Sequence, residues 1–273
     1  MRITKLNTKD IRQTQERNFS TPLRIILGML IALALTSGRC KSTVENKTDD
    51  NGFVKIFDGK TLKGWTGDTT YWRVENGNLV GEIIPTTILK SNSFIVWQGG
   101  ELSDFELTLE CKITSAGNSG INYRSEQFTD VPYALKGYQA DIDGVNRYTG
   151  QNYEERARTT LAYRGEIVTV NALQNSPATL KDRIKNNAWL ERTVTGSLGS
   201  SDSLKTLIKS EDWNKIHLVI KGNRLQHYVN NVLMSEVIDN DKVNGKSTGL
   251  LGVQVHVGPP MKVEYRNIML KKI

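Results

Sequence analysis

Residues 137–144 contain a row of polar side chains that could carry out acid–base chemistry. The segment alternates between an apolar and a polar set, namely Tyr138, Ala140 and Ile142 against Gln139, Asp141 and Asp143. Because successive side chains of a β-strand point to opposite faces, this pattern predicts a strand with one core face and one acidic face. Adjacent carboxylates repel each other and their pKa values are easily separated. Such a row is expected to be either solvated or functional.

Two further segments, 121–124 and 251–257, repeat this arrangement. Each has an apolar face, and their polar faces carry Asn122 and Arg124 in the first and Gln254 and His256 in the second. Amides, carboxylates and guanidinium groups form paired hydrogen bonds with hydroxyl groups. We therefore predict a sheet face that binds a carbohydrate through Asn122, Arg124, Gln139 and Gln254. Tyr138, an aromatic residue near them in sequence, is predicted to add a platform for the sugar.

A merely solvated face is the alternative, because antiparallel sheets often expose one face to water. Residues 105–113 alternate for nine positions and show what such a face contains, with Glu106, Thr108, Glu110 and Lys112 opposite the apolar set. The amides, arginine and histidine of the other three segments differ from that composition. The difference favours a binding face.

His256, Asp143 and Asp141 are the predicted catalytic residues. Imidazole titrates near neutral pH, so His256 could act as a base or as a metal ligand. The other two histidines, His217 and His227, are compatible with structural roles in or beside strands. A divalent metal ion could be held by the three catalytic candidates, but the sequence contains no compact metal motif. The metal ligands are therefore left undetermined. Motifs of serine or cysteine nucleophiles, phosphate loops and dinucleotide-binding turns do not occur.

The elements that must position these residues are short strands separated by turns. Hairpin turns are predicted at Asn76-Gly77 and at Gly222-Asn223, and helical signals are confined to residues 178–189. Regular short strands without intervening helices predict a single all-β domain, a sandwich or jelly roll. Residues 144–210 interrupt the rhythm, and we expect a long ordered loop there.

The N-terminal region has the layout of a secretory signal. Arg24 precedes the apolar run 25–35, and small and polar residues follow it up to Cys40. At 1.5 Å per residue, this run would span roughly 16 Å, which is too short for a bilayer core of about 30 Å. We predict a signal peptide at 1–39 with an N-terminal extension, and a flexible tether at 40–51. A membrane anchor is the alternative.

Cys40 occupies the place of the lipidated cysteine of a bacterial lipoprotein, although Arg39 stands where a small residue is usual. The expected location is therefore the periplasm or the outer-membrane surface, with membrane contact only through a lipid. The other cysteine, Cys111, falls on the apolar face of a predicted strand and is expected to fill the core.

The net charge of +7 carries little information about partners. Residues 1–39 hold seven Lys/Arg against two Asp/Glu, and the remainder holds 29 against 27. The body has no basic run or basic-aromatic stripe, which argues against a nucleic acid partner.

Residues 52–273 resemble the 3-keto-disaccharide hydrolase family, formerly domain of unknown function 1080. The resemblance rests on a series of motifs in the expected order: Gly52–Trp65, Trp72–Gly81, Asp104–Leu107, Gly117–Ser125, Gly137–Asp143, Trp213-Asn214 and Val263–Ile268. It implies a concanavalin A-like jelly-roll sandwich and an enzyme that cleaves glycosides oxidised at C3. In that chemistry a base removes the C2 proton, the enolate expels the C1 substituent and water adds to the product. A divalent metal could stabilise the enolate oxygen.

Two other functions fit the same residues. A non-catalytic carbohydrate-binding module would use the polar face for binding alone, since fold by itself does not determine function. A surface adhesion domain is the third interpretation.

Overall fold

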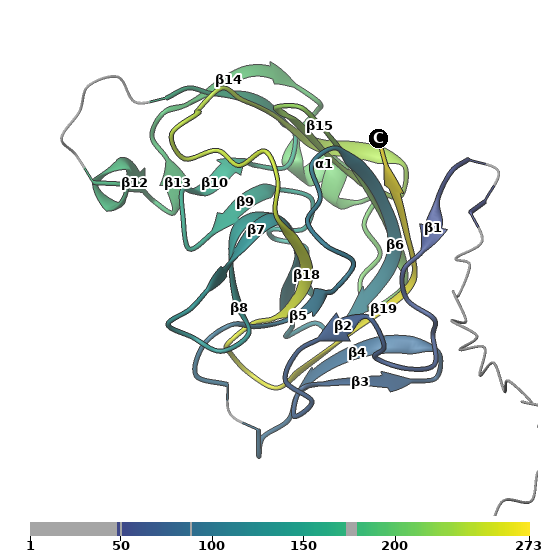
Figure 1. The fold of residues 1–273 in the computed structure, drawn as a ribbon. Coiled ribbons are helices and arrows are strands. Elements are labelled where there is room, and N and C mark those ends of the chain that lie inside the picture. Colours follow the sequence, from purple (N-terminus) through teal and green to yellow (C-terminus); the bar gives the residue numbers. More distant parts are fainter. Residues whose placement is uncertain (1–47, 50, 88, 173–178) are drawn as a thin grey trace, which may run out of the picture. The chain divides into compact units, whose positions relative to one another are not determined.

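Two β-sheets, facing each other across an apolar core, make up the described part of the chain between Thr48 and Ile273 (Figure 1). The computed structural model describes residues 48–49, 51–87, 89–172 and 179–273. The predicted all-β sandwich is confirmed. The predicted signal peptide, Cys40 and most of the predicted tether lie outside the described residues. Among the residues described, no helix is long and apolar enough to cross a membrane.

The first sheet has ten strands. Nine run in the order β14-β11-β17-β16-β15-β6-β19-β4-β3, and β1 pairs with β19. Their bounds are β1 Val54–Lys55, β3 Trp72–Glu75, β4 Asn78–Ile83, β6 Phe105–Ile113, β11 Glu166–Val170, β14 Arg192–Ser197, β15 Asn214–Lys221, β16 Arg224–Val229, β17 Val232–Asp239 and β19 Met261–Lys272. We call it sheet A.

The second sheet, sheet B, has nine strands in the order β12-β13-β10-β9-β8-β7-β18-β5-β2. Their bounds are β2 Trp65–Thr66, β5 Ser93–Trp97, β7 Asn118–Phe128, β8 Ala134–Asp143, β9 Asn152–Glu155, β10 Thr159–Ala162, β12 Ile184–Lys185, β13 Ala188–Trp189 and β18 Leu250–Val255. Helical structure in the described residues is limited to a 3₁₀ turn, Lys181–Arg183, and α1, Ser201–Lys205.

Alternation along the strands produces the core. In β6 every second side chain is buried between the sheets: Phe105, Leu107, Leu109, Cys111 and Ile113. Burial raises the pKa of the Cys111 thiol to about 12, so this cysteine stays protonated and unreactive near neutral pH. The predicted core role of Cys111 is confirmed.

Registry between β7, β8 and β18 brings the predicted polar faces side by side. Asn122 lies opposite Gln139 on β8 and opposite Gly252 on β18. Between Tyr123 and Glu126 the β7–β8 register shifts, and Arg124 there has a φ of 43°. A bulge re-aims the side chains on its strand, so the period-two pattern that predicts the direction of Arg124 stops at this point.

Residues 144–210, predicted to be a long loop, contain six strands and α1 in their described part, 144–172 and 179–210. In the stretch with helical signals, 178–189, only the 3₁₀ turn is helical among the described residues 179–189, and β12 and β13 follow it. These two strands form a hairpin around Asn186 and Asn187, whose φ values are 54° and 58°. Positive φ at both central residues defines a type I′ turn, for which asparagine is well suited. The Asn186-Asn187 pair was therefore the sequence signal for this hairpin turn, and it was overlooked.

One buried ion network ties the two sheets together. The Arg158 guanidinium donates to Glu154 beside it, at 2.6 Å from Nε to Oε2, and to Asp239 of β17, at 2.6 Å from Nη2 to Oδ2. A third carboxylate, Asp241, lies 3.2 Å from Nη1. All four side chains are almost completely buried. The arginine therefore keeps three carboxylates buried away from water. Without its positive charge, these carboxylates would repel each other.

Replacing Arg158 should destabilise the fold severely. The Arg158→Met variant removes the positive charge and leaves three buried carboxylates without a cation, which should lower the free energy of unfolding by about 3–5 kcal/mol. Urea denaturation followed by tryptophan fluorescence measures this loss. Lys136→Ala, which breaks a half-exposed pair with Glu126, is the control and should cost less than about 1 kcal/mol. Similar losses in the two variants would contradict the assigned role.

Candidate functional site

A polar cavity of about 190 Å³ lies on the face of sheet B that points away from sheet A. Its walls come from β8, β9 and the segments around them, and they consist almost entirely of side chains that form hydrogen bonds. The lining residues are Asn118, Gln139, Asp141, Tyr148, Gln151, Tyr153, Glu155, Asn187 and His256. We call this cavity the candidate site.

Asp141 stands at its centre with two amides holding the carboxylate. Gln139 Nε2 donates to Oδ1 at 2.6 Å, and Gln151 Nε2 donates to Oδ2. Burial disfavours the charged form and raises the pKa of Asp141 to about 7, an effect that the two amide donors partly offset and that Glu155 and Asp143 strengthen. A carboxyl group with this pKa is present in both protonation states near neutral pH, as a general acid or base requires.

Gln139 keeps its position through its own neighbours. Gly120 lies opposite Asp141 on β7, and a Cβ atom there would approach the Gln139 side chain to 2.5 Å. Glycine at this position therefore leaves the space that the glutamine fills. Gln254 Nε2 donates to Gln139 Oε1 at 3.2 Å, which continues the row of amides onto β18.

Glu155 is a second carboxyl group in the cavity, and sequence reasoning missed it. Burial raises its pKa, while a hydrogen bond from Asn92 and the nearby Arg156 and His256 side chains act in the opposite direction. Asn92 Nδ2 donates to Oε1 at 3.0 Å. Gln151, Tyr153 and Glu155 alternate along the chain with a period of two, but this signal lies within residues 144–210, which are predicted to be a long loop.

His256 follows β18 and is half-buried at the cavity wall. Its Nδ1 lies 2.7 Å from the Val257 carbonyl oxygen. Because a carbonyl oxygen can only accept, Nδ1 carries the hydrogen, and in the neutral ring Nε2 is left as the acceptor. The imidazole can thus exchange a proton through Nε2.

Asn122 lies on the same face but does not line the cavity. Its side chain is fully buried, and neither its Nδ2 nor its Oδ1 has a hydrogen-bonding partner among the described residues. The structure therefore brings five predicted residues onto one face. These are Asn122, Gln139, Asp141, Gln254 and His256.

Asp143 has a different position from the one predicted. Its carboxylate accepts the backbone N–H groups of Arg147, Tyr148 and Thr149 at 2.7–2.9 Å. An aspartate at a strand end commonly caps a turn in this way. Asp143 holds the loop that carries Tyr148 to the cavity, and its own oxygens are directed at the loop backbone rather than at the candidate site. Its prediction as a base is corrected accordingly.

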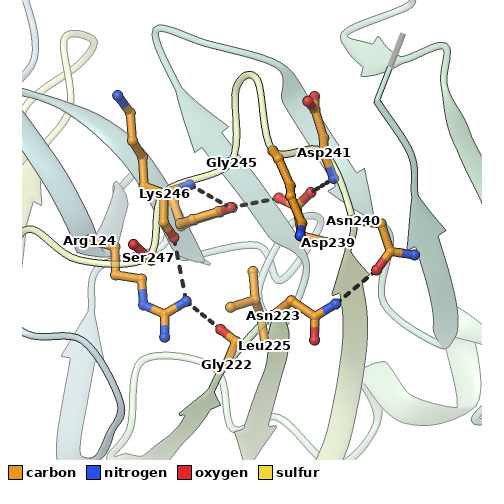
Figure 2. Close-up of a pocket in the computed structure, with 12 residues that line it drawn as sticks. Arg124, Gly222, Asn223, Leu225, Asp239, Asn240, Asp241, Gly245, Lys246 and Ser247 are labelled. Atoms are coloured by element: carbon orange, nitrogen blue, oxygen red, sulfur yellow. Dashed lines mark hydrogen bonds between the residues drawn. The ribbon is translucent and has the colours of Figure 1, made fainter. Parts of the chain in front are cut away.

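Arg124 and Tyr138 also lie outside the candidate site. The bulge in β7 directs the Arg124 guanidinium to the carbonyls of Ser103 and Gly222, at 2.8 and 2.7 Å, and to Asp104. Tyr138 points into the core, and its hydroxyl donates to Asp239 at 2.6 Å. Both residues line a different cavity, in which Figure 2 labels Arg124.

The remaining histidines have structural positions. His227 is buried, its Nε2 accepts from the Tyr123 hydroxyl at 2.9 Å, and burial lowers its pKa to about 4. His217 pairs with Glu106 on the exposed face of sheet A. As for metals, no group of three His, Cys, Asp or Glu side chains in the described part of the chain is arranged to hold an ion.

Comparisons with known proteins agree with a carbohydrate-related site. Residues 52–271 match the family model described as a 3-keto-alpha-glucoside-1,2-lyase-like domain. A 3-keto-disaccharide hydrolase from Bacteroides thetaiotaomicron is 32% identical over 100 residues. That alignment covers 30% of this chain and 30% of the relative, so it spans less than a third of the relative's length.

Two crystal structures from Parabacteroides distasonis, both with a provisional glycosyl hydrolase designation, have the same fold. The first has a TM-score of 0.51 at 19% identity and covers 82% of this chain and 94% of its own. The second has a TM-score of 0.50 at 16% identity, with coverages of 81% and 99%. At these identities the likeness concerns the fold alone.

Stability should depend on pH through Asp141. Its pKa is about 7 in the folded protein and about 3.9 in an unfolded chain, so between these values the folded state holds a proton that the unfolded state has released. The free energy of unfolding therefore falls as the pH rises towards 7. Between pH 5 and pH 8 this group should contribute a decrease of about 2–3 kcal/mol.

The Asp141→Asn variant has no titrating group at this position and should lose that contribution. Urea denaturation of both proteins at pH 5 and pH 8 measures the difference. The same pH dependence in both proteins would show that Asp141 is ionised throughout this range.

Proposed function

This chain belongs to the 3-keto-alpha-glucoside-1,2-lyase-like family, and from that membership we propose that it cleaves glycosides whose sugar carries a ketone at C3. The observation that carries the proposal is the buried Asp141 carboxyl group, with a pKa of about 7, in a cavity lined by amides and hydroxyls. A volume of about 190 Å³ suits one sugar ring rather than a longer chain. The leaving group would then lie towards the opening.

The proposed reaction begins with the C2 proton, which the neighbouring ketone acidifies. Asp141 in its ionised form accepts this proton, and the electron pair forms an enolate whose charge lies on the C3 oxygen. The enolate re-forms the ketone, creates a C1–C2 double bond and expels the C1 substituent. Water then adds across that bond, with OH at C1 and H at C2. A base whose pKa is near the working pH is effective at the first step.

The other groups of the cavity have complementary tasks in this proposal. Glu155 has a raised pKa, which favours its protonated form, so we assign it the donation of a proton to the leaving oxygen. Burial likewise raises the pKa of the Tyr153 hydroxyl, which therefore remains a hydrogen-bond donor. Tyr153 and His256 would stabilise the negative charge of the enolate oxygen.

Asp141→Asn should abolish most of the activity. Removing a general base typically costs about 10²–10⁴-fold in rate. The measurement is kcat/KM for release of the leaving group from 3-keto-glucosides of both anomers. In the wild type, kcat/KM should rise with pH through a midpoint near 7, since the base must be ionised. Glu126→Gln, an exposed change far from the cavity lining, is the control. Activity above a tenth of wild type in Asp141→Asn would contradict the assignment.

Glu155→Gln should discriminate between leaving groups. A 4-nitrophenolate leaves without a proton, whereas a sugar or alkyl alcohol needs one, so the variant should lose about 10²-fold more kcat/KM on the second type than on the first. Rates for the two substrate types, compared in the wild type and the variant, provide the measurement. An equal loss on both would assign Glu155 to binding rather than to proton donation.

A non-catalytic carbohydrate-binding module is the second candidate function. The amide row of Gln139 and Gln254 favours it, because such a row binds hydroxyls without requiring a reaction. Under this alternative the wild type would bind 3-keto-glucosides and release no leaving group from any of them.

A further inference from the structure

A second cavity, of about 610 Å³, opens on the other side of β8 from the candidate site. Figure 2 shows how its walls come from both sheets: Arg124 from β7, the Gly222-Asn223 turn, and the segment 239–247 after β17. The side chains of Leu225 and Tyr138 form its apolar part. Its volume lies within the range of roughly 300–1,000 Å³ that is common for small-molecule sites.

The two carboxylates that line this cavity already accept hydrogen bonds from other parts of the protein. Asp239 accepts from Tyr138 and Arg158. Asp241 accepts from Arg158 and from the backbone N–H groups of Val243 and Asn244. These carboxylates are consequently poor ligands for a metal ion, and they would repel an anion.

Two of the positively charged side chains of the cavity also have partners already. Arg124 donates to three carbonyl oxygens and to Asp104, and Lys246 pairs with Glu126. Of the three cations that line this cavity, Lys242 alone forms no ion pair with any of the described residues. An anionic ligand would therefore meet one available cation and two carboxylates.

The groups that remain for a ligand are neutral. Asn223 Nδ2 donates to Asn240 Oδ1 at 2.8 Å, which places two amides next to each other at the cavity wall (Figure 2). Asn240 Nδ2 also donates to Asn171 Oδ1 at 3.3 Å, and each amide group keeps a second N–H for a ligand. Adjacent amides present both donors and acceptors, and hydroxyl groups can pair with either. Ser247 adds a hydroxyl, and Leu225 adds an apolar surface. The Asp239 backbone N–H donates to the Asn223 carbonyl oxygen at 2.8 Å, which joins the turn that carries Asn223 to the strand of the ion network.

We propose that this cavity is a second carbohydrate-binding site, selective for neutral sugars and separate from the candidate site. A neutral ring with several hydroxyls uses the amides and Ser247 without requiring a counter-charge. The two sites lie on opposite faces of β8, so each can be occupied without the other. Binding here does not depend on turnover in the candidate site.

Amide chemical shifts in a ¹⁵N-labelled wild-type protein test the proposal. The probes are the neutral disaccharides cellobiose, maltose, trehalose and sucrose, together with glucuronate and calcium chloride. At least one disaccharide should produce saturable shifts at Gly222, Gly245 and Ser247. Glucuronate and calcium should not. No shift with any of the four disaccharides, or shifts only at candidate-site residues such as Asp141, would overturn the proposal.

Variants separate specific binding from an unspecific effect. The Asn223→Ala/Asn240→Ala double variant should weaken binding by about tenfold or more, because two hydrogen-bonding amides are lost. Asp141→Asn should leave the affinity of the second cavity unchanged, and so should Lys205→Ala on α1. An unchanged affinity in the double variant, with an unchanged thermal midpoint, would refute the site. Loss of binding in Asp141→Asn would instead identify the candidate site as the one being observed.

Discussion

The buried ion network around Arg158 is the constraint on which the rest of the structure depends. Glu154 faces inward to this arginine, and the next residue along β9, Glu155, faces outward into the candidate site. Because neighbouring residues of a strand point to opposite faces, fixing one fixes the direction of the other. On the side of sheet A, the same guanidinium holds Asp239 and Asp241, which line the second cavity. One side chain thus positions parts of both cavities.

Burial of carboxyl groups gives the candidate site its chemical character. Asp141 and Glu155 both have raised pKa values, and in both the first cause is the loss of water around the charge. Amide donors offset only part of that cost, because a neutral donor stabilises a carboxylate less than a paired cation does. Glu154 differs in having Arg158 as a partner. The outward face of β9 therefore carries a carboxyl that can exchange protons, and the inward face carries one that serves the fold.

Much of the candidate face could be predicted from the sequence where the strands are regular. Gln139, Asp141, Gln254 and His256 follow the period of two, and the structure places them around one cavity or in direct contact with its lining. Arg124 could not be predicted, because a bulge before Glu126 ends the alternation. Asp143 belongs to the right strand, yet its carboxylate turns back to cap a loop. Glu155 was missed because its alternation falls within a segment predicted to be a loop, and Asn187 was missed because it lies in the turn between β12 and β13.

The sequence by itself determined the all-β sandwich, the core face of β6 and the polar face of β8, since all three follow from local alternation of residue types. The tertiary structure alone decided which polar residues meet. The pairing of β8 with β9 brings Gln151 and Glu155 close to Asp141. His256 lies just after β18, more than 100 residues further along the chain, and lines the same cavity. The raised pKa of Asp141 was also decided at this level, because it depends on how much water the surrounding strands exclude. Residue types specify which groups can titrate, and packing specifies where their pKa values lie.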